Sequence, residues 1–157
     1  MQISDQTVLI TGGTAGIGLA LAKQFHSVHN HVIVTGRNAG KLVALRVAHP
    51  DWSFELANMA DLGALDRLVQ TYPHVSVLVN NAGVQYNYAL ADTSMPADMI
   101  TQEIATNLLG PIYLTKRMLA QLLAKPSAAI VNITSSLSVM PKQSAPIYSA
   151  GNSKALR

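Results

Sequence analysis

The sequence contains no cysteine, which excludes disulfides, thiolate metal sites and a thiol nucleophile. Charged residues make up only 12% of the chain, whereas a typical globular domain has about 25%. We therefore expect an unusually apolar surface that favours self-association. The basic residues form no block along the chain, so neither nucleic acid nor an acidic membrane surface is an expected partner.

Segments typical of a signal peptide or a membrane helix are also lacking. The first apolar run, residues 8–10, is too short for a leader and follows Asp5. The uncharged interval 126–141 begins and ends with proline, which is unsuited to a lipid-facing helix. The histidines do not have the spacing of metal ligands, so no metal is expected. These features predict a cytoplasmic protein of one domain.

A glycine-rich turn between an apolar run and a helical segment is the most informative stretch. It carries five residues that we assign to cofactor binding: Gly12, Thr14, Gly16, Ile17 and Gly18. Glycine allows a sharp turn and close backbone approach, and the free amides of the following helix attract an anion. The pattern predicts a cradle for a dinucleotide pyrophosphate. A turn that serves packing alone is the competing interpretation.

Short apolar runs alternate with segments of helical period along the whole chain. Strands are predicted at 7–11, 31–35, 53–57, 75–80 and 128–134, and helices at 16–29, 38–48, 61–71, 101–125 and from 148 onward. This alternation predicts an α/β fold with a doubly wound parallel sheet, Rossmann-like, with about five strands present. Asn38 and Asp61 are the expected N-caps of two helices. Gly110 and Pro111 should bend the long helix near Asn107.

Several motifs in sequence order resemble the short-chain dehydrogenases/reductases, in the branch built as a single Rossmann domain. They are the turn at 11–18, Asn80-Asn81-Ala82-Gly83 after the fourth strand, Asn107, Ser135 and Tyr148. The resemblance covers essentially the whole chain and implies one dinucleotide-binding domain, 1–157. It also implies an oxidoreductase that transfers a hydride between NAD(P)H and a small carbonyl or alcohol substrate.

The resemblance implies a role for each of the later motifs. Tyr148 matches the family's proton donor, and Ser135 matches the serine that holds the carbonyl oxygen. Asn107 matches the asparagine that kinks the long helix and holds a water in the proton relay. Asn81 and Gly83 would approach the nicotinamide ribose. The local alternatives are a turn role for Ser135 and a core position for Tyr148.

Cofactor choice depends on the end of the second strand. A carboxylate there would bind the adenosine ribose and repel a 2′-phosphate, whereas a cation would attract the phosphate. The chain has Arg37 and no acidic residue at this point, which favours NADP, with NAD as the alternative. Asn58 stands where the family usually has an aspartate facing the adenine, and it can still offer an amide hydrogen bond.

The sequence departs from the family pattern in two places. The family's lysine follows its tyrosine by four residues, but position 152 is Asn152 and the next lysine is Lys154. Around a helix, a residue four positions on lies within about 40°, whereas one six positions on lies about 120° away. Lys154 is therefore the candidate cation in a displaced position. Removal of Gly151 and Asn152 would restore the family spacing.

The second departure from the family pattern is the C-terminal end of the sequence. Family members usually continue well past the tyrosine, so the chain looks truncated at its C-terminus, with further strands missing and the fifth strand left as an exposed apolar edge. The long helix 101–125, part of the subunit interface in relatives, is the expected surface for a homo-oligomer. The alternative to an active enzyme is a truncated, inactive nucleotide-binding relative or a gene fragment. Substrate identity is not encoded in these motifs.

Overall fold

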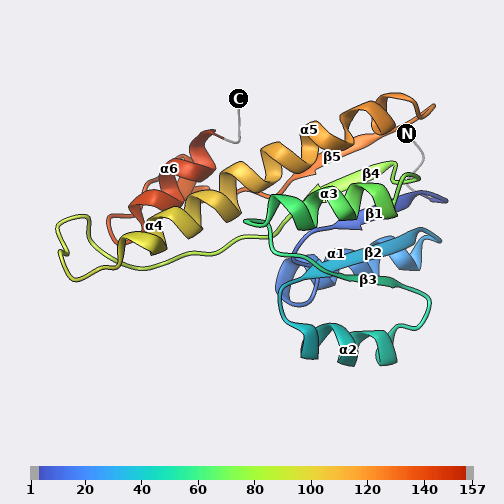
Figure 1. The fold of residues 1–157 in the computed structure, drawn as a ribbon, viewed down its shortest axis with the longest axis horizontal. Helices are drawn as coiled ribbons and strands as arrows, with labels where there is room; N and C mark the ends of the chain where they lie inside the picture. Colours follow the sequence, from blue (N-terminus) through green and yellow to red (C-terminus); the bar gives the residue numbers. More distant parts are fainter. Residues whose placement is uncertain (1–3, 155–157) are drawn as a thin grey trace.

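The protein, represented by a computed structural model that describes residues 4–154 without the side chain of Lys154, is built around one parallel sheet (Figure 1). Its strands are β1 (Thr7–Ile10), β2 (His31–Gly36), β3 (Ser53–Leu56), β4 (Val77–Asn80) and β5 (Ala129–Asn132). Their spatial order is β3-β2-β1-β4-β5, and every pairing is parallel. The predicted doubly wound α/β fold with five strands is confirmed. The order reverses between β1 and β4, which creates a crevice at their carboxyl ends.

Helices cover both faces of the sheet. They are α1 (Gly16–Ser27), α2 (Ala39–Ala48), α3 (Leu62–Thr71), α4 (Ala97–Ile104), a π-helical turn η1 (Ala105–Leu109), α5 (Gly110–Leu123), a 3₁₀ turn η2 (Ser136–Ser138) and α6 (Pro146–Lys154). Figure 1 shows α4, η1 and α5 as one long rod, with α6 lying beside α4. Within residues 4–154, no helix is long and apolar enough to cross a membrane.

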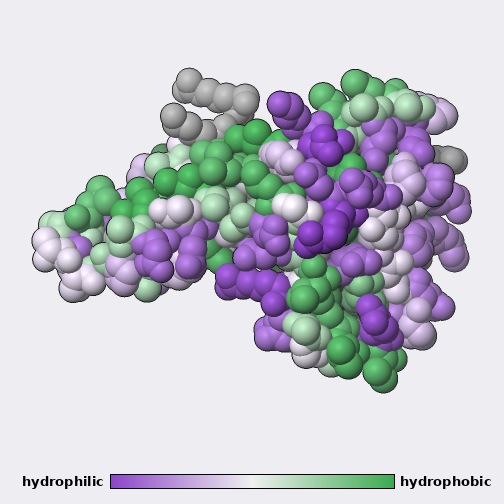
Figure 2. All heavy atoms as spheres, viewed as in Figure 1, coloured by the Kyte–Doolittle hydropathy of each residue, from purple (hydrophilic) through white to green (hydrophobic). Residues whose placement is uncertain are grey.

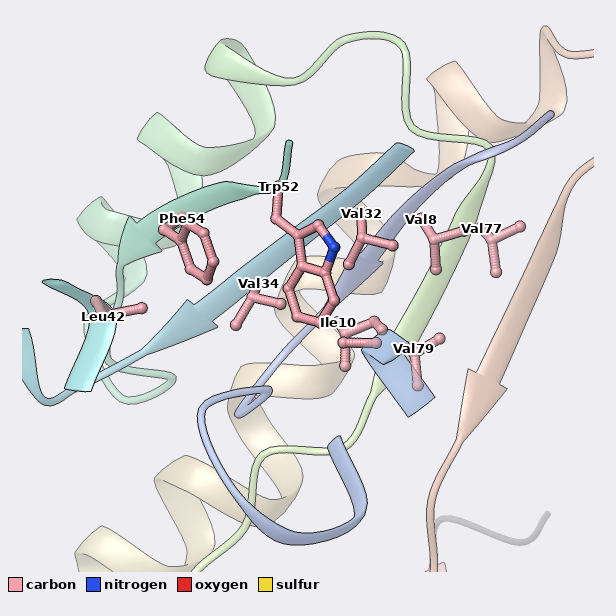
Figure 3. Packing of buried hydrophobic residues seen from close by; sticks show 10 residues of the cluster. Val8, Ile10, Val32, Val34, Leu42, Trp52, Phe54, Val77 and Val79 are labelled. Atoms are coloured by element: carbon pink, nitrogen blue, oxygen red, sulfur yellow. The ribbon is translucent and has the colours of Figure 1, made fainter. Parts of the chain in front are cut away.

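The sheet buries different side chains on its two faces. Val8 and Ile10 pack toward α1 and α2 in a cluster that also contains Trp52 (Figure 3). Leu9 and Leu78 point the other way, toward α3 and α5. Both sets are fully or almost fully buried, which explains why these strands are continuous apolar runs rather than alternating ones.

The predicted caps of α2 and α3 are both present. The Asn38 side chain accepts a hydrogen bond from the Lys41 amide at 2.9 Å, and the Asp61 side chain accepts one from the Ala64 amide at 3.0 Å. Each satisfies a backbone donor that the first helical turn leaves free. The sequence therefore located the beginning of these helices correctly.

Two helices begin earlier than predicted, and each begins at a proline or directly after one. The long helix starts at Ala97, after Pro96, and not at 101. The last helix starts at Pro146 and not at Tyr148. Proline fits the first turn because the amide that it lacks has no partner there.

At the place of the predicted bend near Asn107, the helix continues through the π-helical turn Ala105–Leu109. Gly110 follows it, and a Cβ at this position would clash with the Met59 carbonyl oxygen. The helix therefore passes unusually close to the segment after β3. A π turn inside an α-helix often marks a functional site.

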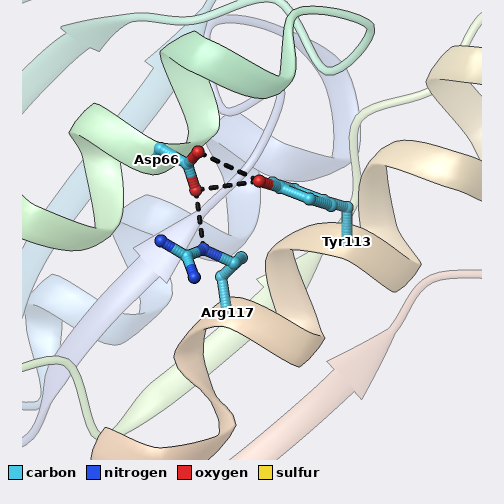
Figure 4. A network of polar contacts seen from close by, with 3 residues as sticks. All are labelled: Asp66, Tyr113 and Arg117. Carbon is cyan, nitrogen blue, oxygen red and sulfur yellow. Dashed lines mark hydrogen bonds and ion pairs between the residues drawn. The ribbon is translucent and has the colours of Figure 1, made fainter.

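A polar cluster joins the two helices on one face of the sheet (Figure 4). The Tyr113 hydroxyl lies 3.0 Å from each carboxylate oxygen of Asp66, and the Arg117 Nε donates to the same carboxylate at 2.6 Å. The hydrogen bond to Asp66 raises the pKa of Tyr113. The cluster is partly exposed, so it fixes the contact between α3 and α5 more than it stabilises the fold.

The outer edge of the sheet is apolar, as predicted. In the described part of the chain, β5 pairs only with β4, and the side chains of Ile130 and Val131 are 38% and 37% exposed. An edge of this kind is a template for pairing with another chain unless something covers it.

Candidate active site

The first of two adjoining clefts lies at the carboxyl ends of the strands and has a volume of about 500 Å³. Its base is the glycine turn between β1 and α1, and its walls come from the segments that follow β2, β3 and β4. Every residue that the sequence assigned to cofactor binding lines it: Gly12, Thr14, Gly16, Ile17, Gly18, Arg37, Asn58, Asn81 and Gly83. The cleft therefore sits where an open α/β sheet is expected to bind its ligand.

Two glycines in the turn are required by space. Gly12 has φ +65, and a Cβ there would lie 2.7 Å from the Cα of Ala82. A Cβ at Gly18 would clash with the Asn81 side-chain amide and with the Gly12 carbonyl. No larger residue allows the two loops to approach so closely. The close approach leaves the turn open toward the cleft, which fits a pyrophosphate bound against the backbone.

The helix that opens from this turn presents an uncapped N-terminus. Among the described residues, no side chain accepts a hydrogen bond from the first turn of α1, and that turn contains no acidic residue. Ile17, in the same turn, is 63% exposed at the mouth of the cleft. The amides and the positive end of the helix dipole are therefore left for an anion.

Hydrogen bonds join the glycine turn to the motif after β4. The Thr11 hydroxyl oxygen accepts from the amides of Asn81 and Ala82, each at 3.0 Å. The Asn81 side chain donates to the carbonyls of Thr11 and Gly12 at 2.9 and 3.2 Å. Asn81 therefore contributes to the cleft by holding the shape of the turn.

Arg37 and Asn58 form the far end of the first cleft, and both are exposed. Lys41 lines the same end, although sequence reasoning did not select it. The signal was available, because Lys41 lies in the first turn of the helix that Asn38 caps. The structure thus places two cations at the end of the cleft where the adenosine ribose is expected.

The second cleft has a volume of about 350 Å³ and brings together Asn107, Ser135 and Tyr148. These residues come from η1, from the loop between β5 and η2, and from α6. The two clefts share Ile17 and the segment 81–84. A ligand bound along the first cleft can therefore extend into the second.

Asn107 and Ser135 also have local structural partners. The Asn107 side chain donates to the Val84 carbonyl at 2.7 Å and accepts from the Val84 amide at 2.9 Å. The Ser135 hydroxyl oxygen accepts from the Leu137 amide at 3.2 Å and so caps η2. Asn107 therefore fixes the backbone beside Gly83, while Ser135 is both a cap and part of the cleft wall.

Asn152, and not a lysine, lines the second cleft beside Tyr148. The chain is α-helical from Pro146 to Lys154, so the residue one turn after Tyr148 is Asn152, whose side-chain amide donates to the Tyr148 carbonyl at 2.9 Å. The side chain of Lys154 lies outside the described residues. Across residues 4–154, no group of three or more histidine, aspartate or glutamate side chains is arranged to hold a metal ion.

The parallel sheet with helices on both faces defines an α/β domain of the Rossmann class. More particularly, the chain belongs to the short-chain dehydrogenase family, because the model of that family, described as short chain dehydrogenase, matches residues 6–155. The resemblance seen in the motifs is thereby confirmed.

Relatives and solved structures agree with this assignment. The chain is 35% identical to the "uncharacterized oxidoreductase DltE" of Bacillus subtilis, over 96% of this chain and 61% of that protein. It is 34% identical to the dehydrogenase/reductase SDR family member 7B of Bos taurus, over 94% of this chain and 48% of that protein. A solved short chain dehydrogenase/reductase family protein superposes with a TM-score of 0.91 at 28% identity, over 99% of this chain and 66% of that one. The chain thus spans about half to two thirds of these proteins.

Proposed function

We propose that the chain is the dinucleotide-binding domain, 1–157, of an oxidoreductase that transfers a hydride between NADPH and a carbonyl or alcohol. The observation that carries this proposal is the continuity of the two clefts through Ile17 and residues 81–84. It joins a cradle suited to a pyrophosphate with a cleft lined by a serine and a tyrosine hydroxyl.

The chain's own residues would bind and polarise the substrate, since a bound nicotinamide cofactor supplies the hydride. The hydroxyls of Ser135 and Tyr148 would hydrogen bond the carbonyl oxygen, and Tyr148 would give it a proton as negative charge develops. Asn107 would hold the wall beside Gly83 through Val84. Free tyrosine has a pKa of about 10, so a nearby cation would favour this step, and Lys154 is the sequence's candidate for it.

NADP is the proposed cofactor, with NAD as the alternative, because Arg37 and Lys41 line the end of the first cleft without a carboxylate among its described lining residues. Replacement of Arg37 by Ala should weaken NADPH binding about tenfold or more, since a charge-assisted hydrogen bond contributes about 1.5–3 kcal/mol. NADH binding should not change, because NADH has no 2′-phosphate. Calorimetric titration with both cofactors measures the difference, and equal losses for both would contradict the NADP assignment.

A second candidate function is nucleotide binding without turnover. It is favoured by Asn152, which occupies the place beside Tyr148 where a lysine would lower the pKa of the tyrosine. An amide carries no charge, so it cannot supply the electrostatic assistance that an ammonium would.

One pair of measurements separates these two functions. NADPH binding is followed by calorimetry, and NADPH oxidation is followed by absorbance with simple aldehydes and ketones, for the wild-type chain and for Tyr148→Phe. The oxidoreductase proposal expects binding by both chains and oxidation only by the wild type. Binding by both without oxidation supports the second function, and no binding at millimolar NADPH contradicts both.

We also propose that the chain forms a homo-oligomer through its long helical rod, residues 97–123. Exposed side chains on the rod recur with the alternating three- and four-residue spacing of a helix-to-helix seam: Leu109, Ile112, Lys116, Leu119 and Leu123. Figure 2 shows hydrophobic residues gathered over the part of the molecule where α4 to α6 lie. The predicted location remains the cytoplasm, since a reducing compartment suits a chain without cysteine.

A further inference from the structure

Glu103 is a buried acid close to the second cleft that the proposed chemistry does not use. It lies on α4 and is only 1% exposed. Glutamate is almost never fully buried without a partner, and within residues 4–154 no ion pair involves this carboxylate. Its position therefore needs an explanation.

The contacts of Glu103 show that it holds the segment that follows β4. Its Oε1 accepts a hydrogen bond from the Tyr86 amide at 3.3 Å, and its Oε2 accepts one from the Tyr88 hydroxyl at 3.4 Å. One helical turn later, Asn107 holds both backbone groups of Val84. Alternate residues of the segment are thus fixed to successive turns of one helix, and Figure 1 shows the segment running alongside α4.

Tyr88 continues this connection to the helix that carries Tyr148. Tyr88 is only 7% exposed. The Tyr88 amide donates to the Ser144 carbonyl at 2.8 Å, just before α6 begins. Tyr88 therefore bridges the Glu103 carboxylate, through its hydroxyl, and Ser144, two positions before α6, through its amide.

We propose that Glu103 is a positioning residue: through Tyr88 it fixes the segment that leads into α6 and thereby the place of the Tyr148 hydroxyl in the second cleft. The proposal rests on the proposed role of Tyr148. It differs from the role of Asn107, which reaches the cleft wall through Val84 and does not touch α6 through this bridge. It also explains why a carboxyl is retained where an apolar side chain would pack at less cost.

The surroundings of the carboxyl agree with this role. The titratable group that faces Glu103 is the Tyr88 hydroxyl, because Tyr86 contacts the carboxylate through its backbone amide and its own hydroxyl bonds Gln102. Burial raises the pKa of Glu103, and hydrogen bonds from Tyr86 and Tyr88 oppose the rise. Burial also raises the pKa of Tyr88, with Glu103 as a further cause. Both groups therefore hold their protons more tightly than the free side chains do.

The test follows the resonance of Tyr148 in the chain labelled with ¹³Cζ-tyrosine, assigned by its disappearance in Tyr148→Phe. Glu103→Ala and Tyr88→Phe should each shift or broaden the Tyr148 signal in the absence of any cofactor. Tyr72→Phe is the matched control, because Tyr72 donates to Glu55 at 2.9 Å in a second tyrosine–glutamate pair that lies away from the clefts. That variant should leave the Tyr148 signal in place.

The outcomes separate this inference from the proposed function. A Tyr148 signal that is unchanged in Glu103→Ala or in folded Tyr88→Phe overturns the positioning role, as does an equal shift in Tyr72→Phe. Should Glu103→Ala fail to fold, the comparison of Tyr88→Phe with Tyr72→Phe decides the question alone. Addition of NADPH to the wild type tests the proposed function instead, since that function requires the Tyr148 signal to respond to the cofactor.

Discussion

At the residue scale, the shape of the first cleft depends on Gly12, which has no side chain. Gly12 combines a positive φ with contact to the Ala82 backbone, so both the conformation and the space exclude a side chain. Gly12→Ala should abolish NADPH binding measured by calorimetry and lower the melting temperature, since a strained residue of this kind costs about 1–3 kcal/mol.

Gly151 offers the matched control for that substitution. A Cβ at Gly151 meets no atom within 4 Å, and alanine is preferred to glycine inside a helix by about 0.5–1 kcal/mol. Gly151→Ala should therefore keep NADPH binding and leave the melting temperature equal or higher. If Gly12→Ala binds NADPH as the wild type does, the cradle is not where the pyrophosphate lies.

The buried acid Glu103 gives a pH-dependent prediction at the same scale. Because burial raises its pKa, the folded chain binds this proton more tightly than the unfolded chain does. The stability that the protonated carboxyl contributes is full below the unfolded pKa of about 4.3 and is lost as the pH rises through the folded value. Above the folded pKa, the ionised and buried carboxylate therefore lowers the stability.

Glu103→Gln removes the cost of burying a charge, and its side-chain oxygen can still accept a hydrogen bond from the Tyr86 amide. The variant should melt a few degrees above the wild type at neutral pH, since 1 kcal/mol corresponds to about 2–4 °C in a domain of this size. The difference should shrink as the pH falls toward the unfolded pKa. Calorimetric melting across this pH range measures the difference in melting temperature. A difference that grows as the pH falls would contradict the prediction.

Residue chemistry was also the part of the site that the sequence predicted best. Glycines, Ser135 and Tyr148 stand out because their side chains are chemically distinctive next to predicted strand ends, and they line the two clefts. Lys41 and Glu103 did not stand out, because an ordinary charged residue in a helix gives no local signal of what it faces. The burial of Glu103 and its contact with Tyr88 depend on the tertiary structure.

At the scale of single elements, α6 determines which residue lies beside Tyr148. Its helical phase puts Asn152 beside Tyr148 in the second cleft. Asn152→Lys would place an ammonium one turn from the tyrosine, and a neighbouring positive charge lowers a pKa by about 1–3 units. We expect the ¹³Cζ signal of Tyr148 to titrate at lower pH and any carbonyl reduction to rise at least about tenfold, the rate change that corresponds to one such unit.

Ser153→Lys is the control for that substitution, because Ser153 is the exposed neighbour of Asn152 and does not line the second cleft. It adds the same charge to the same helix one position away. A Tyr148 pKa that falls equally in both variants would show a general charge effect and not the effect of helical phase.

Element boundaries were predictable where the sequence contains a cap, and less so elsewhere. Asn38 and Asp61 marked helix beginnings because a side chain supplies the missing acceptor within three residues. The π turn at 105–109 replaced a simple proline bend, because it depends on how closely Gly110 approaches Met59, a residue from another part of the chain. The local sequence pattern does not indicate that contact.

At the scale of the whole molecule, apolar side chains are exposed on the edge strand β5 and on the seam along the long rod. The seam is the proposed oligomer contact, and Ile112 at its centre is 57% exposed. Ile112→Glu should convert an oligomer to monomers, because it buries a charge in an apolar helix contact. Light scattering after size exclusion reports the mass directly.

Val43→Glu is the matched control, since Val43 is 61% exposed on α2, on the opposite side of the sheet. It should leave the oligomer mass unchanged. A wild-type chain that is already monomeric at high concentration, or an oligomer that survives Ile112→Glu, would contradict the seam as the interface.

The central claim is that a dinucleotide cradled by the first cleft reaches Tyr148 in the second. A crystal structure of the chain grown with NADPH tests it most directly. The account predicts the pyrophosphate against the amides that open α1, the 2′-phosphate near Arg37 and Lys41, and the nicotinamide ring between residues 81–84 and the hydroxyls of Ser135 and Tyr148. A cofactor bound elsewhere, or one whose nicotinamide ring points away from Tyr148, would contradict it.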